Sequence, residues 1–418
     1  MLLDISPLRR HRDFRFVFVG QLVSTFGSFI TYVALPVQVF ELTKSSAAVG
    51  LIGSVQLVPL ALTALWGGAL ADALDRRKLL LRCEALMMLG SLALVANSLL
   101  SKPSVALLFA VAAFTAAVNG FHRPALEAIT QKLVEPSELA AVSALTSLRG
   151  TSAAIAAPAL AGIAIAALGL PATYAIEVAT FAISLAALAA IRAMPPADHA
   201  QPAGLATIVE GLRYAAKRPE LIGTYVVDIV AMTFAMPMAV FPALAVELGG
   251  TATIGFLYSA MSIGALAVTL FSAWTRGVRR RGAAIVLAAA VWGLAIFALG
   301  FARSLPIAVA CLAVAGGADM VSGLFRMTLW NETIPPALRG RMASIEQLSY
   351  MTGPLLGNVR AGFMAERFGL ASSIAWGGLL CVAGVALCIP VLPAFWRYRQ
   401  AIPDDDVGMA DREPAENA

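Results

Sequence analysis

The sequence predicts an all-α polytopic membrane protein, with twelve transmembrane helices in two sets of six. Hydrophobic residues make up 59% of the 418 residues, charged residues only 13%, and the mean hydropathy is +0.81. A soluble domain would carry roughly 25% charged residues. Apolar runs long enough to cross a bilayer recur along the chain, and one long polar connection divides them into two equal sets.

Each predicted span has at least the roughly 18 to 20 residues that a helix needs to cross the hydrocarbon core. The first span contains Gln21, lies beyond four arginines and is followed by no small-residue cleavage site, so we interpret it as a retained helix rather than a signal peptide. In chain order the spans are 16–41, 47–71, 79–101, 104–131, 140–168, 172–192, 221–247, 251–275, 283–301, 305–334, 341–365 and 371–394.

The longest connection sets the predicted domain boundaries. We expect an N-terminal six-helix bundle over 1–192, a cytoplasmic connection over 193–220, a C-terminal six-helix bundle over 221–399 and a disordered tail over 400–418. In the connection, apolar residues recur at i, i+3, i+4 and i+7 from Leu205, which is typical of an amphipathic helix in the membrane interface.

The distribution of Lys and Arg predicts the orientation. Of the 30 cationic residues, most fall in the termini and in the connections on one side of the membrane, and only Lys44, Lys102, Arg303 and Arg367 fall on the other side. Because cytoplasmic loops carry the excess of Lys and Arg, both termini are predicted to be cytoplasmic, as in a multi-pass protein of the bacterial inner membrane. This topology explains the net charge of +5 without a nucleic-acid partner.

The connection between the second and third spans holds the most specific motif, Gly68-x-x-x-Asp72-x-x-x-Arg76-Arg77. This order resembles the corresponding loop of the major facilitator superfamily of transporters. The resemblance implies a conformational switch, in which Asp72 faces the start of span 11 and Arg76 pairs with Glu127. Contacts that form in one state only would bias the conformational equilibrium.

Further stretches resemble the efflux branch of that superfamily, which includes bacterial siderophore exporters and macrolide or multidrug exporters. A span-5 antiporter motif is partly matched, with Pro158 and Gly162, and a looser counterpart holds Pro354 and Gly357. We expect prolines inside spans to bend the helices. The other matching stretches are 12–16, 45–50, 211–214 with 218–219, and 339–341, and the other prolines inside spans are Pro36, Pro59 and Pro237.

Short internal repeats support two related halves. Val118-Asn-Gly120-Phe-His-Arg123 in span 4 recurs as Val321-Ser-Gly323-Leu-Phe-Arg326 in span 10. Transporter folds are commonly built from duplicated units. Arg123 and Arg326 are therefore predicted to occupy equivalent positions, where either could attract an anionic substrate or form a cytoplasmic gate.

Ionisable residues inside the spans are the candidate functional groups, because a charge at membrane depth costs at least about 2.5 to 3.5 kcal/mol and should face a cavity or a partner. Asp228, Asp319 and Glu177 are candidates for proton coupling or substrate contact, and the alternative role is to pair with Arg123, Arg149, Arg326 or Arg360. Gln21 and Tyr32 belong to a polar stripe along span 1, which adds candidate substrate contacts.

The predicted function is proton-coupled export of small amphipathic compounds, such as drug-like molecules or siderophores, by alternating access. The alternatives are metabolite uptake by the same fold, a non-transporting membrane scaffold, or a membrane enzyme, which the scattered histidines His11, His122 and His199 disfavour. We expect no cofactor and no metal, because the four cysteines lack metal-ligand spacing. We also expect no ATP drive, because no nucleotide-binding loop occurs. The predicted partners are a small-molecule substrate, protons and membrane lipids, and the predicted state is a monomer.

Overall fold

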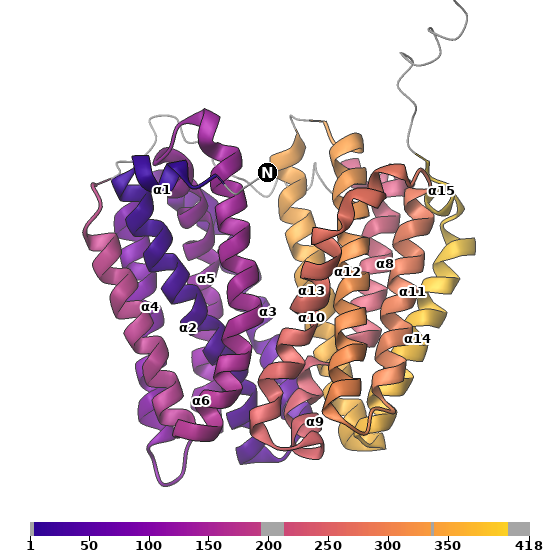
Figure 1. Cartoon of the computed structure of the whole chain (residues 1–418), viewed down its shortest axis with the longest axis horizontal. Coiled ribbons are helices and arrows are strands. Elements are labelled where there is room, and N and C mark those ends of the chain that lie inside the picture. Colours follow the sequence, from indigo (N-terminus) through magenta and orange to yellow (C-terminus); the bar gives the residue numbers. More distant parts are fainter. Residues whose placement is uncertain (1–3, 194–212, 336–337, 400–418) are drawn as a thin grey trace, which may run out of the picture.

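The structure is a computed structural model that describes residues 4–193, 213–335 and 338–399. Within these residues every regular element is a helix, and none is a β-strand. The helices form two bundles that stand side by side, one built from α2 to α6 and the other from α8 to α14 (Figure 1). The predicted all-α membrane class is confirmed.

Capping residues and a glycine set the helix ends of the first bundle. α4 starts where Asp75 accepts a hydrogen bond from the N–H of Lys78 at 3.2 Å, and α5 starts where Ser104 accepts one from Leu107 at 3.3 Å. α6 bends at Gly169, whose φ of +78° favours glycine. The elements are α1 (Ser6–Arg10), α2 (Arg12–Thr43), α3 (Ser46–Ala73), α4 (Arg76–Ser98), α5 (Val105–Lys132), η1 (Pro136–Glu138) and α6 (Leu139–Ala189).

In the second bundle, the seventh span is broken at Pro237, between α8 and the 3₁₀ turn η2. Proline lacks the N–H that would continue the helix, so at this residue the expected bend takes the form of a break. The elements are α8 (Pro219–Ala235), η2 (Met238–Val240), α9 (Phe241–Leu248), η3 (Thr251–Thr253), α10 (Ile254–Leu270), η4 (Ser272–Gly277), α11 (Arg281–Leu299), α12 (Leu305–Thr333), α13 (Arg339–Phe368), α14 (Leu370–Val391) and α15 (Pro393–Trp396).

The helices account for all twelve predicted spans. In the described part of the chain, 10 helical stretches are long and apolar enough to cross a membrane. One of them, Pro136–Ala189, contains the bend at Gly169 and accounts for two spans, and α13 with 30 residues supplies the last. The twelve-helix prediction is confirmed. The predicted tail and most of the predicted connection lie outside the described residues.

The two ends of the molecule differ in how the bundles approach each other. We call the end with α1, the α3–α4 turn and α15 the terminal face, and the end with α9 and residues 99–104 the distal face; they are the upper and lower ends of Figure 1. The bundles meet toward the distal face and diverge toward the terminal face (Figure 1).

Small residues allow the close approach at the distal face. A Cβ atom on Gly50 of α3 would lie 2.5 Å from the carbonyl oxygen of Asn358 in α13. A Cβ atom on Gly162 of α6 would lie 2.9 Å from the carbonyl oxygen of Ala252 in η3. Backbones that come this close are typical of helix pairs in membranes, where small residues replace large side chains at the contact.

Candidate transport site

The second bundle holds a buried arginine between two carboxylates. Arg326 of α12 forms an ion pair with Asp228 of α8, and its second terminal nitrogen lies 3.6 Å from Asp319, two helical turns away on α12. The side chains of Arg326 and Asp228 are only 3% and 6% exposed, whereas that of Asp319 is 42% exposed. A half-exposed carboxylate in mid-span cannot face lipid at acceptable cost, so we infer that Asp319 is directed away from lipid.

Aromatic side chains cover this charged group on the side of the terminal face. The guanidinium of Arg326 lies 5.0 Å from the ring centre of Tyr350 in α13, which is within cation–π range. Tyr350 in turn packs edge-on against Trp330 at 5.8 Å, and Trp330 packs against Tyr225 at 5.7 Å. The indole N–H of Trp330 donates to Thr224 at 2.9 Å, which fixes the ring. Charge and aromatic surface thus lie together.

The first bundle holds a buried carboxylate of a different kind. Glu84 of α4 is fully buried and accepts a hydrogen bond from the side-chain amide of Gln21 in α2, which also donates to Ser184 at 3.3 Å. His122 of α5 places Nε2 3.4 Å from the Glu84 carboxylate. Sequence analysis singled out Gln21 but missed Glu84, although the rule that selected Asp228, a carboxylate inside an apolar span, applies equally to it.

Glu177 forms a third buried polar group, nearer the distal face. It is 5% exposed and accepts hydrogen bonds from the hydroxyl groups of Thr31 in α2 at 2.5 Å and Ser91 in α4 at 2.7 Å. Neutral hydroxyl donors satisfy this carboxylate, so it has hydrogen-bond partners but no ion pair among the described side chains.

Of the arginines proposed as partners, Arg326 is the one that binds both carboxylates of the second bundle. Arg123 lies 3.4 Å from Glu127 on its own helix, and both side chains are about two-thirds exposed. Arg360 donates to the carbonyl of Ser373 at 3.0 Å. Arg123 and Arg326 therefore match in sequence but differ in environment.

At the distal face, aromatic residues from both bundles close the space between them. Tyr32 of α2 lies 5.6 Å from the ring of Tyr258 in α10, and its hydroxyl group lies 3.0 Å from the sulfur of Met238. Tyr258 packs edge-on against Phe241 of α9 at 4.9 Å. Ser45 adds a hydrogen bond across the bundles to Glu366, at 2.6 Å. These contacts must separate before the distal face can open.

The predicted switch loop is only partly described. Arg77 donates to the carbonyl groups of Leu188 at 2.9 Å and Ala189 at 2.6 Å, where α6 ends, and Arg76 is 4% exposed. Gly68 and Asp72 fall in 64–73, whose side chains lie outside the described part. The pairing of Arg76 with Glu127 and the contact of Asp72 with span 11 stay predictions.

The predicted bend residues lie at tight helix contacts. Pro158 lies in the part of α6 that precedes the bend at Gly169, and Pro354 lies inside α13. The carbonyl group of Pro158 lies against Gly255 of α10, which leaves no room there for a side chain. A side chain on Gly357 would collide with the backbone of Met232 in α8. Whether these helices bend during transport stays a prediction.

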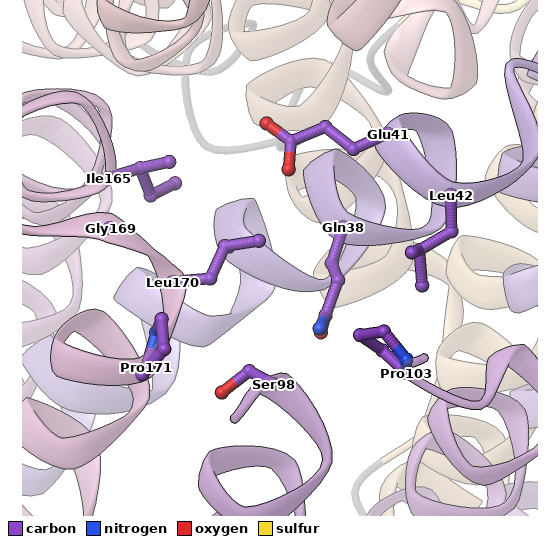
Figure 2. Close-up of a pocket in the computed structure, with 9 residues that line it drawn as sticks. All are labelled: Gln38, Glu41, Leu42, Ser98, Pro103, Ile165, Gly169, Leu170 and Pro171. Carbon is purple, nitrogen blue, oxygen red and sulfur yellow. The ribbon is translucent and has the colours of Figure 1, made fainter. Parts of the chain in front are cut away.

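A separate pocket lies within the first bundle. Figure 2 shows Gln38 of α2, Ser98 at the end of α4 and the bend of α6 around a cavity of about 290 Å³ near the distal face. The Gln38 amide oxygen accepts a hydrogen bond from Tyr174 at 2.8 Å. All its lining residues belong to one bundle, so this pocket is not part of the space between bundles. Among the described residues, no three His, Cys, Asp or Glu side chains are grouped as metal ligands.

Two bundles that meet at one face and diverge at the other, with ionisable groups buried in each, define a membrane transporter of the major facilitator type. Solved structures share this fold. A POT family transporter in complex with 5-aminolevulinic acid superposes with a TM-score of 0.71 at 11% identity, covering 92% of this chain and 97% of that one. A bacterial homologue of the human lysosomal transporter Spinster, inward-facing and unoccupied, gives 0.71 at 14% identity, with 92% and 95% covered.

Comparison with sequence families is more specific. The model of the transmembrane secretion effector family matches residues 4–406. Enterobactin exporters EntS from Shigella boydii serotype 18 and Escherichia coli O139:H28 are each 30% identical over 405 residues, which covers 96% of this chain and 97% of theirs. The chain belongs to the transmembrane secretion effector family of the major facilitator superfamily, and it is an export transporter.

Proposed function

We propose that the protein exports a small amphipathic compound of the siderophore class in exchange for protons. The observation that carries this proposal is the placement of Arg326 between two carboxylates and beneath the Tyr350–Trp330 aromatic surface. Aromatic rings offer stacking surface to a flat, amphipathic ligand, and a cation favours acidic groups on it. Relatives named as enterobactin exporters support this class of substrate.

The state of the structure fits the loading step of an exporter. We infer from the positive charges of the termini and connections that the terminal face is cytoplasmic and that the protein lies in the bacterial inner membrane. The bundles diverge toward that face and touch at the distal face (Figure 1). In this orientation a substrate enters from the cytoplasm, and the Tyr32–Tyr258 contact closes the exit.

Proton exchange can use the two carboxylates that share Arg326. While both are ionised, they hold the guanidinium between them; protonation of either weakens this hold. A bound acidic substrate would compete with the carboxylates for Arg326. A carboxylate that loses this cation binds a proton more readily. Because only differential interactions shift a conformational equilibrium, the proton and the substrate must favour different states of the bundles. Asp319, half exposed, is the group that exchanges protons with water.

The test measures proton movement directly. Everted membrane vesicles are energised to an inside-acid gradient, and acridine-dye fluorescence is followed while catechol siderophores, macrolides or cationic drugs are added. We expect a siderophore to dissipate the gradient with the wild-type protein and with the control Glu247→Gln, which changes an exposed carboxylate of α9. Asp319→Asn and Asp228→Asn should abolish the response. A full response in both variants would remove these residues from the coupling scheme.

A second test concerns the distal contact. Gly255→Val places a side chain against the carbonyl of Pro158, so the distal face cannot close as it does here. We expect spin labels or cysteines on α6 and α10 to report a population shifted toward the distal-open state. Gly150→Ala is the control, because Gly150 is a helical glycine of α6 with no atom near its Cβ position, and this variant should leave the populations as in wild type. Equal populations in wild type and Gly255→Val would contradict a gate at this contact.

A further inference from the structure

A basic cavity lies on the terminal face of the second bundle, away from the site between the bundles. Its volume is about 390 Å³, and it is lined by Arg280, Trp396, Arg397 and Arg399. Arg280 precedes the first residue of α11, and the other three belong to or follow α15. Figure 1 places α15 at the outer margin of the bundle, beside α14. The cavity therefore lies where the protein surface meets the membrane.

Tight packing holds α15 in this position. Phe395 is 1% exposed and inserts its ring against Gly223 of α8, where a side chain would collide with it. Its backbone carbonyl group lies against Gly282, the second residue of α11, which also has no room for a side chain. Since two glycines make room for this one residue, the arginines that follow it are placed by a packed element rather than by a free end.

The cavity carries unneutralised positive charge. Two carboxylates of the neighbouring helices are already engaged, because Glu332 pairs with Arg281 and Glu220 lies 3.4 Å from Arg218. Within the described residues, no carboxylate forms an ion pair with the three arginines that line the cavity. Arginine binds phosphate through paired N–H groups, so three around one cavity favour an anion with several oxygens.

Apolar surface continues from the cavity toward the distal face. Leu287, Val291 and Leu294 follow Arg280 by 7, 11 and 14 residues, which places them on one side of α11, and they are 58%, 44% and 54% exposed. Leu387 and Val391 of α14 are also exposed. Trp396 at the rim has the amphipathic ring that is enriched at membrane–water interfaces. A ligand here can have an anionic head and apolar chains.

We propose that this cavity is a binding site for an anionic phospholipid, held by its headgroup phosphate. Arg280, Arg397 and Arg399 contact the phosphate oxygens, Trp396 lies at the level of the glycerol, and the acyl chains follow the exposed leucines and valine of α11. Basic pockets at this level of membrane proteins bind anionic headgroups. The exposed apolar strip favours a lipid over free phosphate, which has no chains to place there. The site is independent of the transported substrate.

The experiment uses the full-length protein, purified in detergent and stripped of lipid. Native mass spectrometry measures the binding of added phosphatidylglycerol and phosphatidylcholine. Changing all three arginines to Gln should weaken phosphatidylglycerol binding about a hundredfold, since each cation near an anionic lipid contributes roughly fivefold. The control changes Arg9, Arg15 and Lys78 to Gln, three exposed cations on the terminal face of the first bundle, and should bind as the wild type does. Equal thermal unfolding of both variants confirms that they fold.

Further arms identify the occupant. Phosphatidylglycerol that binds wild type and control, but not the cavity variant, supports the proposal; equal binding by all three overturns it. Displacement of the lipid by an equal concentration of inorganic phosphate would identify free phosphate as the ligand and overturn the lipid assignment. A chain that ends at Arg399 is compared with the full-length protein. If lipid binds the shortened chain only, the acidic residues Asp404, Asp405 and Asp406 occupy the cavity in the full-length protein, and the proposal is overturned.

Discussion

The two bundles bury a carboxylate at a similar depth but stabilise it in different ways. Asp228 and Glu84 each lie between two and three helical turns from the terminal-face end of their helices, α8 and α4. Asp228 has a buried arginine as its partner. Glu84 has a side-chain amide and an imidazole, Gln21 and His122. One group is an ion pair with an arginine, and the other is a hydrogen-bonded network of a carboxylate, an amide and an imidazole.

Because of this difference, losing the partner of the buried carboxylate has a different consequence in each bundle. In the second bundle, ionised Asp228 and Arg326 stabilise each other, and removing either leaves a buried charge alone. In the first bundle, Glu84 is held by hydrogen-bonding side chains, so replacing its carboxylate with an amide leaves no arginine without its partner. The sequence repeat therefore does not preserve the partner of the buried carboxylate, which is an arginine for Asp228 and a side-chain amide with an imidazole for Glu84.

The sharpest test of the comparison is Asp228→Asn. Breaking a buried pair by removing one partner costs about 3 to 5 kcal/mol, because Arg326 is left uncompensated except by the more distant Asp319. We expect a large fall in the thermal unfolding temperature of the purified protein. Asp228→Asn combined with Arg326→Gln should recover at least half of this loss, since no buried cation then remains. Equal stability of the single and double variants would contradict the ion-pair account.

Glu84→Gln provides the matched change in the first bundle, with a smaller expected effect. The amide retains an acceptor for Gln21, and no arginine is left unpaired, so we expect a change of about 1 kcal/mol or less, in either direction. The measurement is the same unfolding assay. A loss as large as that of Asp228→Asn would mean that His122 is the counter-charge of Glu84. His122→Gln, alone and combined with Glu84→Gln, then measures the coupling between the two.

Sequence reasoning predicted the spans, a bend at Pro237 and the candidate residues Asp228, Asp319 and Arg326, because each follows from local chemistry in an apolar run. It missed Glu84, because this residue lies close to the cations that begin α4 and therefore resembles part of a charged helix end. It also treated Arg123 and Arg326 as equivalent. Which side of a helix faces the bundle interior depends on tertiary packing, and a shared motif does not determine it.

Arg123→Gln is therefore the smallest expected effect, and it contrasts directly with Arg326. The Arg123–Glu127 pair is an exposed i, i+4 pair, and such pairs contribute about 0.3 to 0.5 kcal/mol. We expect the unfolding temperature of Arg123→Gln to stay close to that of wild type. Arg326→Gln leaves Asp228 buried without its cation, so its unfolding temperature should be much lower. Salt should weaken the Arg123 contribution further, because both charges are in contact with water. A loss at Arg123 comparable to that at Arg326 would show that the repeat preserves a structural role and not only a sequence.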